Sequence, residues 1–111
     1  MEKVKVGVIG CGLAWEKLHY PAFKELADRY QIVALCERHP EVAEDWGHRL
    51  GLDVTRDVFT DYRQMLERAD LQVVDIVVPI PQNHQVAEEV ARMGKHIILE
   101  KPLGATYDQA V

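Results

Sequence analysis

The residues whose type and spacing point most directly to chemistry are Gly10 and Gly12, which follow an apolar run of β-branched residues and precede a helix-forming stretch. In a turn between a strand and a helix, a second glycine without a Cβ lets a diphosphate approach the backbone, and the helix N-terminus favours its negative charge. The pattern predicts dinucleotide binding, with Cys11, Leu13 and Ala14 completing the turn. A tight turn without any ligand is the alternative interpretation.

Trp15 occupies the third position of this G-x-G-x-x-G pattern, where glycine or alanine is usual. An indole cannot pack as closely as glycine, so we expect a wider turn, or an indole that shields the diphosphate. Pro21 lacks an N–H, which predicts an irregular entry over residues 14–20 and a regular helix from about Pro21. At helical spacing, apolar residues are expected to face the sheet at Ala22, Phe23, Leu26 and Ala27.

A second apolar run, residues 32–37, ends in Glu37. A carboxylate at this position of a dinucleotide-binding fold accepts hydrogen bonds from the adenosine ribose, and it would repel a 2′-phosphate. Glu37 therefore favours NAD. The next residue, Arg38, could instead bind the phosphate of NADP, so NADP is the alternative cofactor.

Composition is that of an ordinary globular domain, with 111 residues, 48% hydrophobic residues, 28% charged residues and a formal net charge of −5. The sequence contains no cluster of Lys and Arg, so we do not expect nucleic acid as a partner. Without a signal peptide or a long apolar run, we expect a cytoplasmic protein with no membrane partner. Cys11 and Cys36 lack metal-site spacing, so we expect no metal and two buried, reduced thiols. A reactive Cys11, activated by the nearby helix N-terminus, is the alternative.

Buried strand-like runs alternate with amphipathic stretches along the whole chain, which predicts an α/β fold. We expect a doubly wound parallel sheet of the Rossmann type, with three α/β/α layers and the strand order 3-2-1-4-5. Further strands are expected at 54–59, 71–78 and 96–99, and helices at 40–50, 62–69 and up to residue 93. Gly51 and Gly94 are the expected helix stops, and Thr60 or Asp61 the cap of the 62–69 helix. A last helix starting at Thr106 would barely begin, so we expect residues 1–111 to be one dinucleotide-binding domain truncated before its last strand.

Motifs spread over nearly the whole chain resemble the N-terminal NAD(P)-binding domain of the Gfo/Idh/MocA oxidoreductases. They are VGVIGCG at 6–12, ALCERHPE at 34–41, PQNH at 81–84 and GKHIILEKPLG at 94–104. The third is similar to the family's TPNxxH element, with Ile80 in place of Thr and Gln82 in place of Asn. The last contains Glu100-Lys101-Pro102, which matches the family's EKP motif.

The resemblance implies a catalytic role for Lys101, near the nicotinamide and the reacting carbinol. An ammonium there can stabilise an alkoxide or share in proton transfer, while Glu100 holds Lys101 and Pro102 stiffens the loop. It also implies that Pro79, Ile80, Pro81, Asn83 and His84 border the cofactor, with His84 in the first turn of a helix. The alternatives are a solvated surface lysine, a Pro81 that only starts the helix, and a surface or capping His84. His19 and His48 have no identifiable partner.

The implied reaction is hydride transfer between a nicotinamide and a secondary carbinol or ketone of a sugar, inositol or similar polyol. By resemblance, most substrate contacts and the usual acid/base histidine belong to a second domain. We therefore expect residues 1–111 alone to bind the dinucleotide with little turnover. A non-catalytic NAD-binding or sensing module, and a scaffold or interaction protein that binds no dinucleotide, are the alternatives. An uncovered sheet edge would also favour a homo-oligomer.

Overall fold

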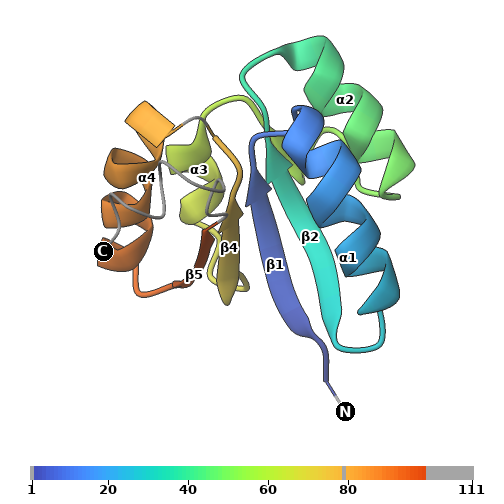
Figure 1. Ribbon diagram of the computed structural model, residues 1–111, viewed down its shortest axis with the longest axis horizontal. Helices are drawn as coiled ribbons and strands as arrows, with labels where there is room; N and C mark the ends of the chain where they lie inside the picture. The colour runs from blue at the N-terminus through green and yellow to red at the C-terminus, as the bar shows by residue number, and fades with distance from the viewer. Residues whose placement is uncertain (1, 79, 100–111) are drawn as a thin grey trace.

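The computed structural model describes residues 2–78 and 80–99, which form a parallel sheet between two layers of helices (Figure 1). The strands are β1 (Val4–Ile9), β2 (Tyr30–Cys36), β3 (Val58–Phe59), β4 (Val73–Ile76) and β5 (His96–Leu99). The helices are the π-helix η1 (Trp15–His19), followed by α1 (Tyr20–Glu25), α2 (Pro40–Arg49), α3 (Tyr62–Leu66) and α4 (Ile80–Arg92).

All the pairings of this five-stranded sheet are parallel, and the order is β3-β2-β1-β4-β5. This confirms the predicted strand order and the predicted Rossmann-type α/β class. The chain turns to opposite sides of β1, first toward β2 and later toward β4. Open α/β sheets of this kind bind ligands at the carboxyl ends of the strands beside that reversal.

Each face of the sheet carries its own core, because successive side chains of a strand point to opposite faces. In β1, Val8 packs on the side of η1, α1 and α2, and Ile9 packs on the side of α3 and α4. Figure 1 shows α1 and α2 on one side of the sheet and α3 and α4 on the other. The doubly wound, three-layer prediction is therefore confirmed for the described residues.

The predicted irregular entry to the first helix is a π-helix, in which the N–H of Tyr20 donates to the carbonyl of Trp15. The indole of Trp15 has no exposed surface and makes an edge-to-face contact with Trp46, with the ring centroids 5.6 Å apart. The expectation that it shields a diphosphate is wrong. The wider π-turn accommodates the indole in the core between η1 and α2, where the usual pattern has a small residue.

The face predicted for the first helix is wrong for three of its four residues. Phe23 is half-buried and packs on the core, whereas Ala22, Leu26 and Ala27 are exposed. For Leu26 and Ala27 the reason is the length of α1, which ends at Glu25, so that both lie in the turn toward β2; Ala22 lies within α1, on its exposed side. Helical spacing no longer decides their direction there.

Most other boundaries follow the predicted signals. Gly51 and Gly94 have φ values of 73° and 77° after α2 and α4, as helix stops require. Asp61 caps α3 by accepting the N–H of Arg63. The helix α3 is shorter than predicted and ends at Leu66, and β3 and β4 are shorter than their apolar runs. Because α4 starts at Ile80, His84 lies beyond the first turn and not within it.

Candidate functional site

The turn after β1 is built around Gly10. Any residue with a side chain at this position would force the neighbouring backbone to move. Its φ is 96°, and a Cβ at this position would lie 2.7 Å from the carbonyl oxygen of Val77. Its N–H donates to the carbonyl of Cys36 at 2.8 Å. Gly10 therefore lets β1, the end of β2 and the segment after β4 meet closely, which defines the floor of the site.

Gly12 differs from Gly10, because a Cβ there would meet no atom within 4 Å. Nothing in the described protein fold requires a glycine at this position. The space beside it opens into a pocket of about 540 Å³. An open glycine at the edge of a pocket is consistent with a bound group that must approach the backbone.

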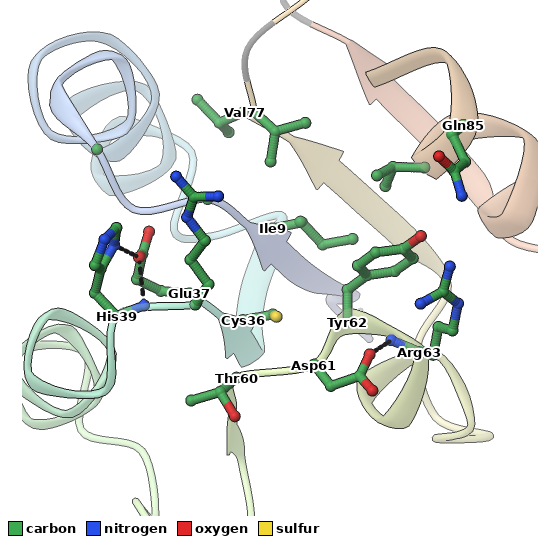
Figure 2. A pocket seen from close by; sticks show the side chains of 15 residues that line it. Ile9, Cys36, Glu37, His39, Thr60, Asp61, Tyr62, Arg63, Val77 and Gln85 are labelled. Carbon is green, nitrogen blue, oxygen red and sulfur yellow. Dashed lines mark hydrogen bonds and ion pairs between the residues drawn. The ribbon is translucent and has the colours of Figure 1, made fainter. Parts of the chain in front are cut away.

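This pocket lies at the carboxyl ends of β1, β2 and β4, where the reversal of strand order predicts a ligand site. Figure 2 shows Glu37 and His39 on one wall, and Tyr62, Arg63 and Gln85 on the other. Its described lining comes from five segments of the chain: Ile9, Gly10, Gly12, Cys36, Glu37, Arg38, His39, Thr60, Asp61, Tyr62, Arg63, Val77, Val78, Gln85 and Val86.

Among the residues predicted for the cofactor site, the pocket brings together Gly10, Gly12, Glu37 and Arg38. Cys11, Leu13 and Ala14 are not in its described lining. The Cys11 side chain is buried in the core, and its backbone contributes an N–H to Glu37, while Leu13 is exposed. His84 is exposed on α4.

The remaining site predictions fall where side chains are not described. Pro79, Glu100, Lys101 and Pro102 lie outside the described residues, as does Thr106. Ile80, Pro81 and Asn83 contribute the backbone of the first turn of α4. The implied roles of these residues stay predictions.

Three hydrogen-bond contacts from Cys11 and His39 hold the carboxylate of Glu37 in place. Its Oε1 accepts the N–H of Cys11 at 3.1 Å, and its Oε2 accepts the N–H of His39 at 2.8 Å and lies 2.7 Å from His39 Nδ1. Burial raises the pKa of Glu37, but these hydrogen bonds outweigh burial and lower the pKa below its usual value. The carboxylate is thus ionised at neutral pH and fixed between the glycine turn and the start of α2.

Cys11 and Cys36 are buried, free thiols, as predicted. Burial, followed by the charge of Asp61 and then of Glu37, raises the pKa of Cys36 to about 12. Burial and the charge of Glu37 also raise the pKa of Cys11 well above its usual range. The alternative of a reactive Cys11 is therefore wrong, because desolvation and a nearby carboxylate oppose the thiolate.

The opposite wall of the pocket was not predicted from the sequence. Arg63 Nε donates to Glu89 Oε1 at 2.9 Å, and the hydroxyl of Tyr62 donates to the other carboxylate oxygen of Glu89. These contacts join α3 to α4. Their only sequence signal is the position of Tyr62 and Arg63 just after β3, since residues that follow parallel strands meet at one edge of the sheet.

A second contact missed by sequence reasoning joins His19 to Asp75. Asp75 is fully buried in β4, and its Oδ2 lies 2.7 Å from His19 Nδ1 at the end of η1. The expectation that His19 has no partner is wrong, and His48 also lies near a carboxylate, 3.7 Å from Glu44. A single Asp inside an apolar strand was the available signal, because a buried carboxylate requires a partner.

Within residues 2–78 and 80–99, no group of three or more His, Cys, Asp or Glu side chains is arranged to hold a metal ion. None of the described helices has the length and apolar character needed to cross a membrane.

A parallel sheet wound in both directions from β1, with a glycine turn and an ionised carboxylate at one pocket, defines a Rossmann-type α/β domain. The chain belongs to the Gfo/Idh/MocA family, because residues 4–111 match the family described as an oxidoreductase family with an NAD-binding Rossmann fold.

Relatives of known activity and structure agree with this assignment. Levoglucosan dehydrogenase of Pseudarthrobacter phenanthrenivorans is 30% identical over 99% of this chain, which spans 29% of that protein. An oxidoreductase from Thermotoga maritima, known from its crystal structure, is 32% identical in sequence, with a TM-score of 0.83. The match covers 99% of this chain and 34% of the Thermotoga maritima chain. A 3-ketoreductase from Actinomadura kijaniata, solved with TDP-benzene and NADP, is 26% identical, with a TM-score of 0.81, over 97% of this chain and 34% of that one. The chain thus spans about a third of the length of these proteins.

Proposed function

We propose that residues 1–111 form the dinucleotide-binding domain of an NAD(P)-dependent oxidoreductase, with NAD as the preferred cofactor and NADP as the alternative. The observation that carries this proposal is the pocket bordered by the open Gly12 and by Glu37. It offers a backbone that a diphosphate can approach and, on the same wall, a carboxylate for a ribose.

The residues present fit a dinucleotide. The side-chain position at Gly12 is empty, so a diphosphate could contact the amides at the start of η1. An ionised carboxylate has about four acceptor sites, and the three hydrogen bonds from Cys11 and His39 leave about one of them, on Oε1, for a ribose hydroxyl. The apolar side chains of Ile9, Val77 and Val78 provide surface for a ring system.

The bound nicotinamide would accept or supply a hydride, and the role of this chain is to bind and orient it. The relatives support a carbohydrate-type substrate. One is levoglucosan dehydrogenase, and another is a 3-ketoreductase solved with a TDP compound and NADP. We therefore propose hydride transfer to or from a secondary carbinol or ketone of a sugar, inositol or similar polyol. Lys101 remains our candidate for stabilising the alkoxide.

The test is a calorimetric titration of this chain with NAD and with NADP, together with the variant Gly12→Val. Because Gly12 has free space around it, the variant should keep the melting temperature of the wild type. Its added methyl groups should weaken dinucleotide binding by about tenfold or more, the cost of losing close backbone contacts to a diphosphate. Ala27→Val, at an exposed turn, is the matched control and should change neither quantity.

Two results would contradict the proposal. If the wild-type chain binds neither dinucleotide at millimolar concentration, the interpretation as a scaffold or interaction protein is favoured. If Gly12→Val binds as tightly as the wild type, the diphosphate does not lie at this turn.

A further inference from the structure

We propose that His39 sets how strongly this site discriminates against a 2′-phosphate, so that the preference for NAD over NADP depends on pH. The inference rests on the proposed function, because it requires the adenosine ribose to lie beside Glu37.

The geometry assigns the hydrogen atom between His39 and Glu37. The carboxylate can only accept, so the ring nitrogen Nδ1, which lies 2.7 Å from Glu37 Oε2, must donate. The second ring nitrogen, Nε2, is then an acceptor when the ring is neutral and a donor when it is charged. One protonation event therefore changes both the charge and the hydrogen-bonding character of this wall of the pocket.

The two partners differ in their contact with solvent. The side chain of Glu37 is 11% exposed, whereas that of His39 is 67% exposed. The carboxylate is therefore fixed in the wall of the pocket, while the ring beside it is open to water. Histidine is the side chain whose ordinary charge change falls between pH 5 and 8. At the acidic end of that range, a cation would stand next to the carboxylate that repels a 2′-phosphate.

Other charged and titratable groups lie around His39. Arg38 lines the pocket beside it and stays charged throughout this range, as does Arg63 on the far wall. Asp61 borders the pocket from the start of α3. From the glycine turn, Cys11 contributes an N–H and a thiol that burial keeps neutral. Glu41 stands in the first turn of α2, which His39 precedes.

The expected sign follows from these charges. At pH 8 the neutral ring adds no positive charge to offset the negative charge of Glu37, and NADP should bind more weakly than NAD. At pH 6 the charged ring offsets that carboxylate, and the ratio of the dissociation constants of NADP and NAD should fall. One charge contact at a partly exposed site predicts a fall of about threefold to tenfold.

The experiment titrates the full chain with NAD and with NADP at pH 6 and pH 8 and at one ionic strength, for the wild type and for His39→Gln. The 2′-phosphate has its own ionisation near pH ~6, as phosphate esters do, and this also changes the ratio. Glutamine cannot become charged, so the variant measures the contribution of the phosphate alone. We expect a steeper pH dependence of the ratio in the wild type than in the variant.

Proton linkage gives an independent readout. If a charged His39 favours NADP, then NADP binding must favour a charged His39 by the same factor. Calorimetry at pH 7 in two buffers of different ionisation enthalpy should therefore detect more proton uptake with NADP than with NAD in the wild type, and a smaller difference in His39→Gln. Should His39→Gln fold poorly, His39→Asn provides a second uncharged variant with a side chain favoured at a helix N-cap.

The outcomes separate the two proposals. If the wild type binds both dinucleotides but the pH dependence of the ratio is the same in wild type and variants, the role of His39 is refuted and the proposed function stands. If the wild type binds neither dinucleotide at either pH, the proposed function fails, and the role of His39 fails with it.

Discussion

The carboxylate of Asp75 and the imidazole of His19 meet at 2.7 Å, although the two residues are 56 positions apart in the sequence. Asp75 lies in β4, next to β1 in the sheet, and His19 is the last residue of η1. The contact therefore connects the helix that follows the glycine turn to a strand beside it. It ties the last residue of η1 to the central part of the sheet.

Replacing His19 with alanine should destabilise the fold, because it removes a 2.7 Å hydrogen bond to a fully buried carboxylate. We expect the free energy of unfolding to fall by about 2–4 kcal/mol, measured by denaturant titration. His48→Ala is the matched control, since His48 is 68% exposed and lies 3.7 Å from Glu44. Its effect should stay below about 1 kcal/mol. Equal losses in both variants would show that the contact between His19 and Asp75 does not matter for stability.

Replacing Trp15 with alanine should also destabilise the protein, because the indole is fully buried and contacts the rings of Trp46, Tyr20 and Phe23. A loss of about 3–5 kcal/mol is expected for deleting a buried aromatic side chain. Leu13→Ala, two residues earlier, removes a side chain that is 70% exposed and should cost less than about 0.5 kcal/mol. Thermal or chemical unfolding followed by circular dichroism measures both. A small effect at Trp15 would mean that the core between η1 and α2 repacks without the indole.

Acid should weaken the fold partly through Asp57, whose Oδ1 lies 3.0 Å from Arg56 Nε and 2.7 Å from Arg68 Nη1. The hydrogen bond from Arg56 lowers the pKa of Asp57 below its usual value, although burial opposes it. The folded state thus favours the ionised form, so this stabilisation is complete above the pKa of the unfolded chain, ~4, and is lost as pH falls through the lower folded pKa.

Between pH 6 and pH 2.5, the free energy of unfolding should therefore decrease more in the wild type than in Asp57→Asn, by about 1–2 kcal/mol. Denaturant titrations across this range measure the difference. Asp28→Asn, at an exposed position, should keep the pH dependence of the wild type. Parallel curves for the wild type and Asp57→Asn would exclude Asp57 as a source of acid sensitivity.

Local signals in the sequence predicted the framework of the site. The parallel sheet follows from the alternation of apolar runs and helices. Its strand order follows the Rossmann pattern that the glycine turn after the first strand indicates. Gly10 and Glu37 were found because a glycine turn after the first strand, and a carboxylate after the second, have fixed places in such a fold. The sequence also predicted the helix stops at Gly51 and Gly94, since these depend on one residue and its neighbours.

What the sequence did not predict depends on contacts between distant segments. The partner of His19 comes from β4, and the partner of Arg63 comes from α4. The contact between Glu37 and His39 was missed because it requires the carboxylate of Glu37 to turn back toward its own chain. Local signals predicted an irregular entry and a wider turn at Trp15, but the burial of its indole depends on contacts with Trp46 in α2, which no local pattern indicates.

The π-helix η1 also gives this turn a way to accept a change of length. A π-helix closes its hydrogen bond over one residue more than an α-helix does, so η1 holds one residue more than an α-helical turn needs. Deleting a single residue between Trp15 and His19 would restore α-helical bonding in a turn that completes about the same rotation with one residue fewer. The two flanks would then keep their directions, toward the core on one side and toward Asp75 on the other. A chain that is one residue shorter in this turn should therefore still fold with the same sheet.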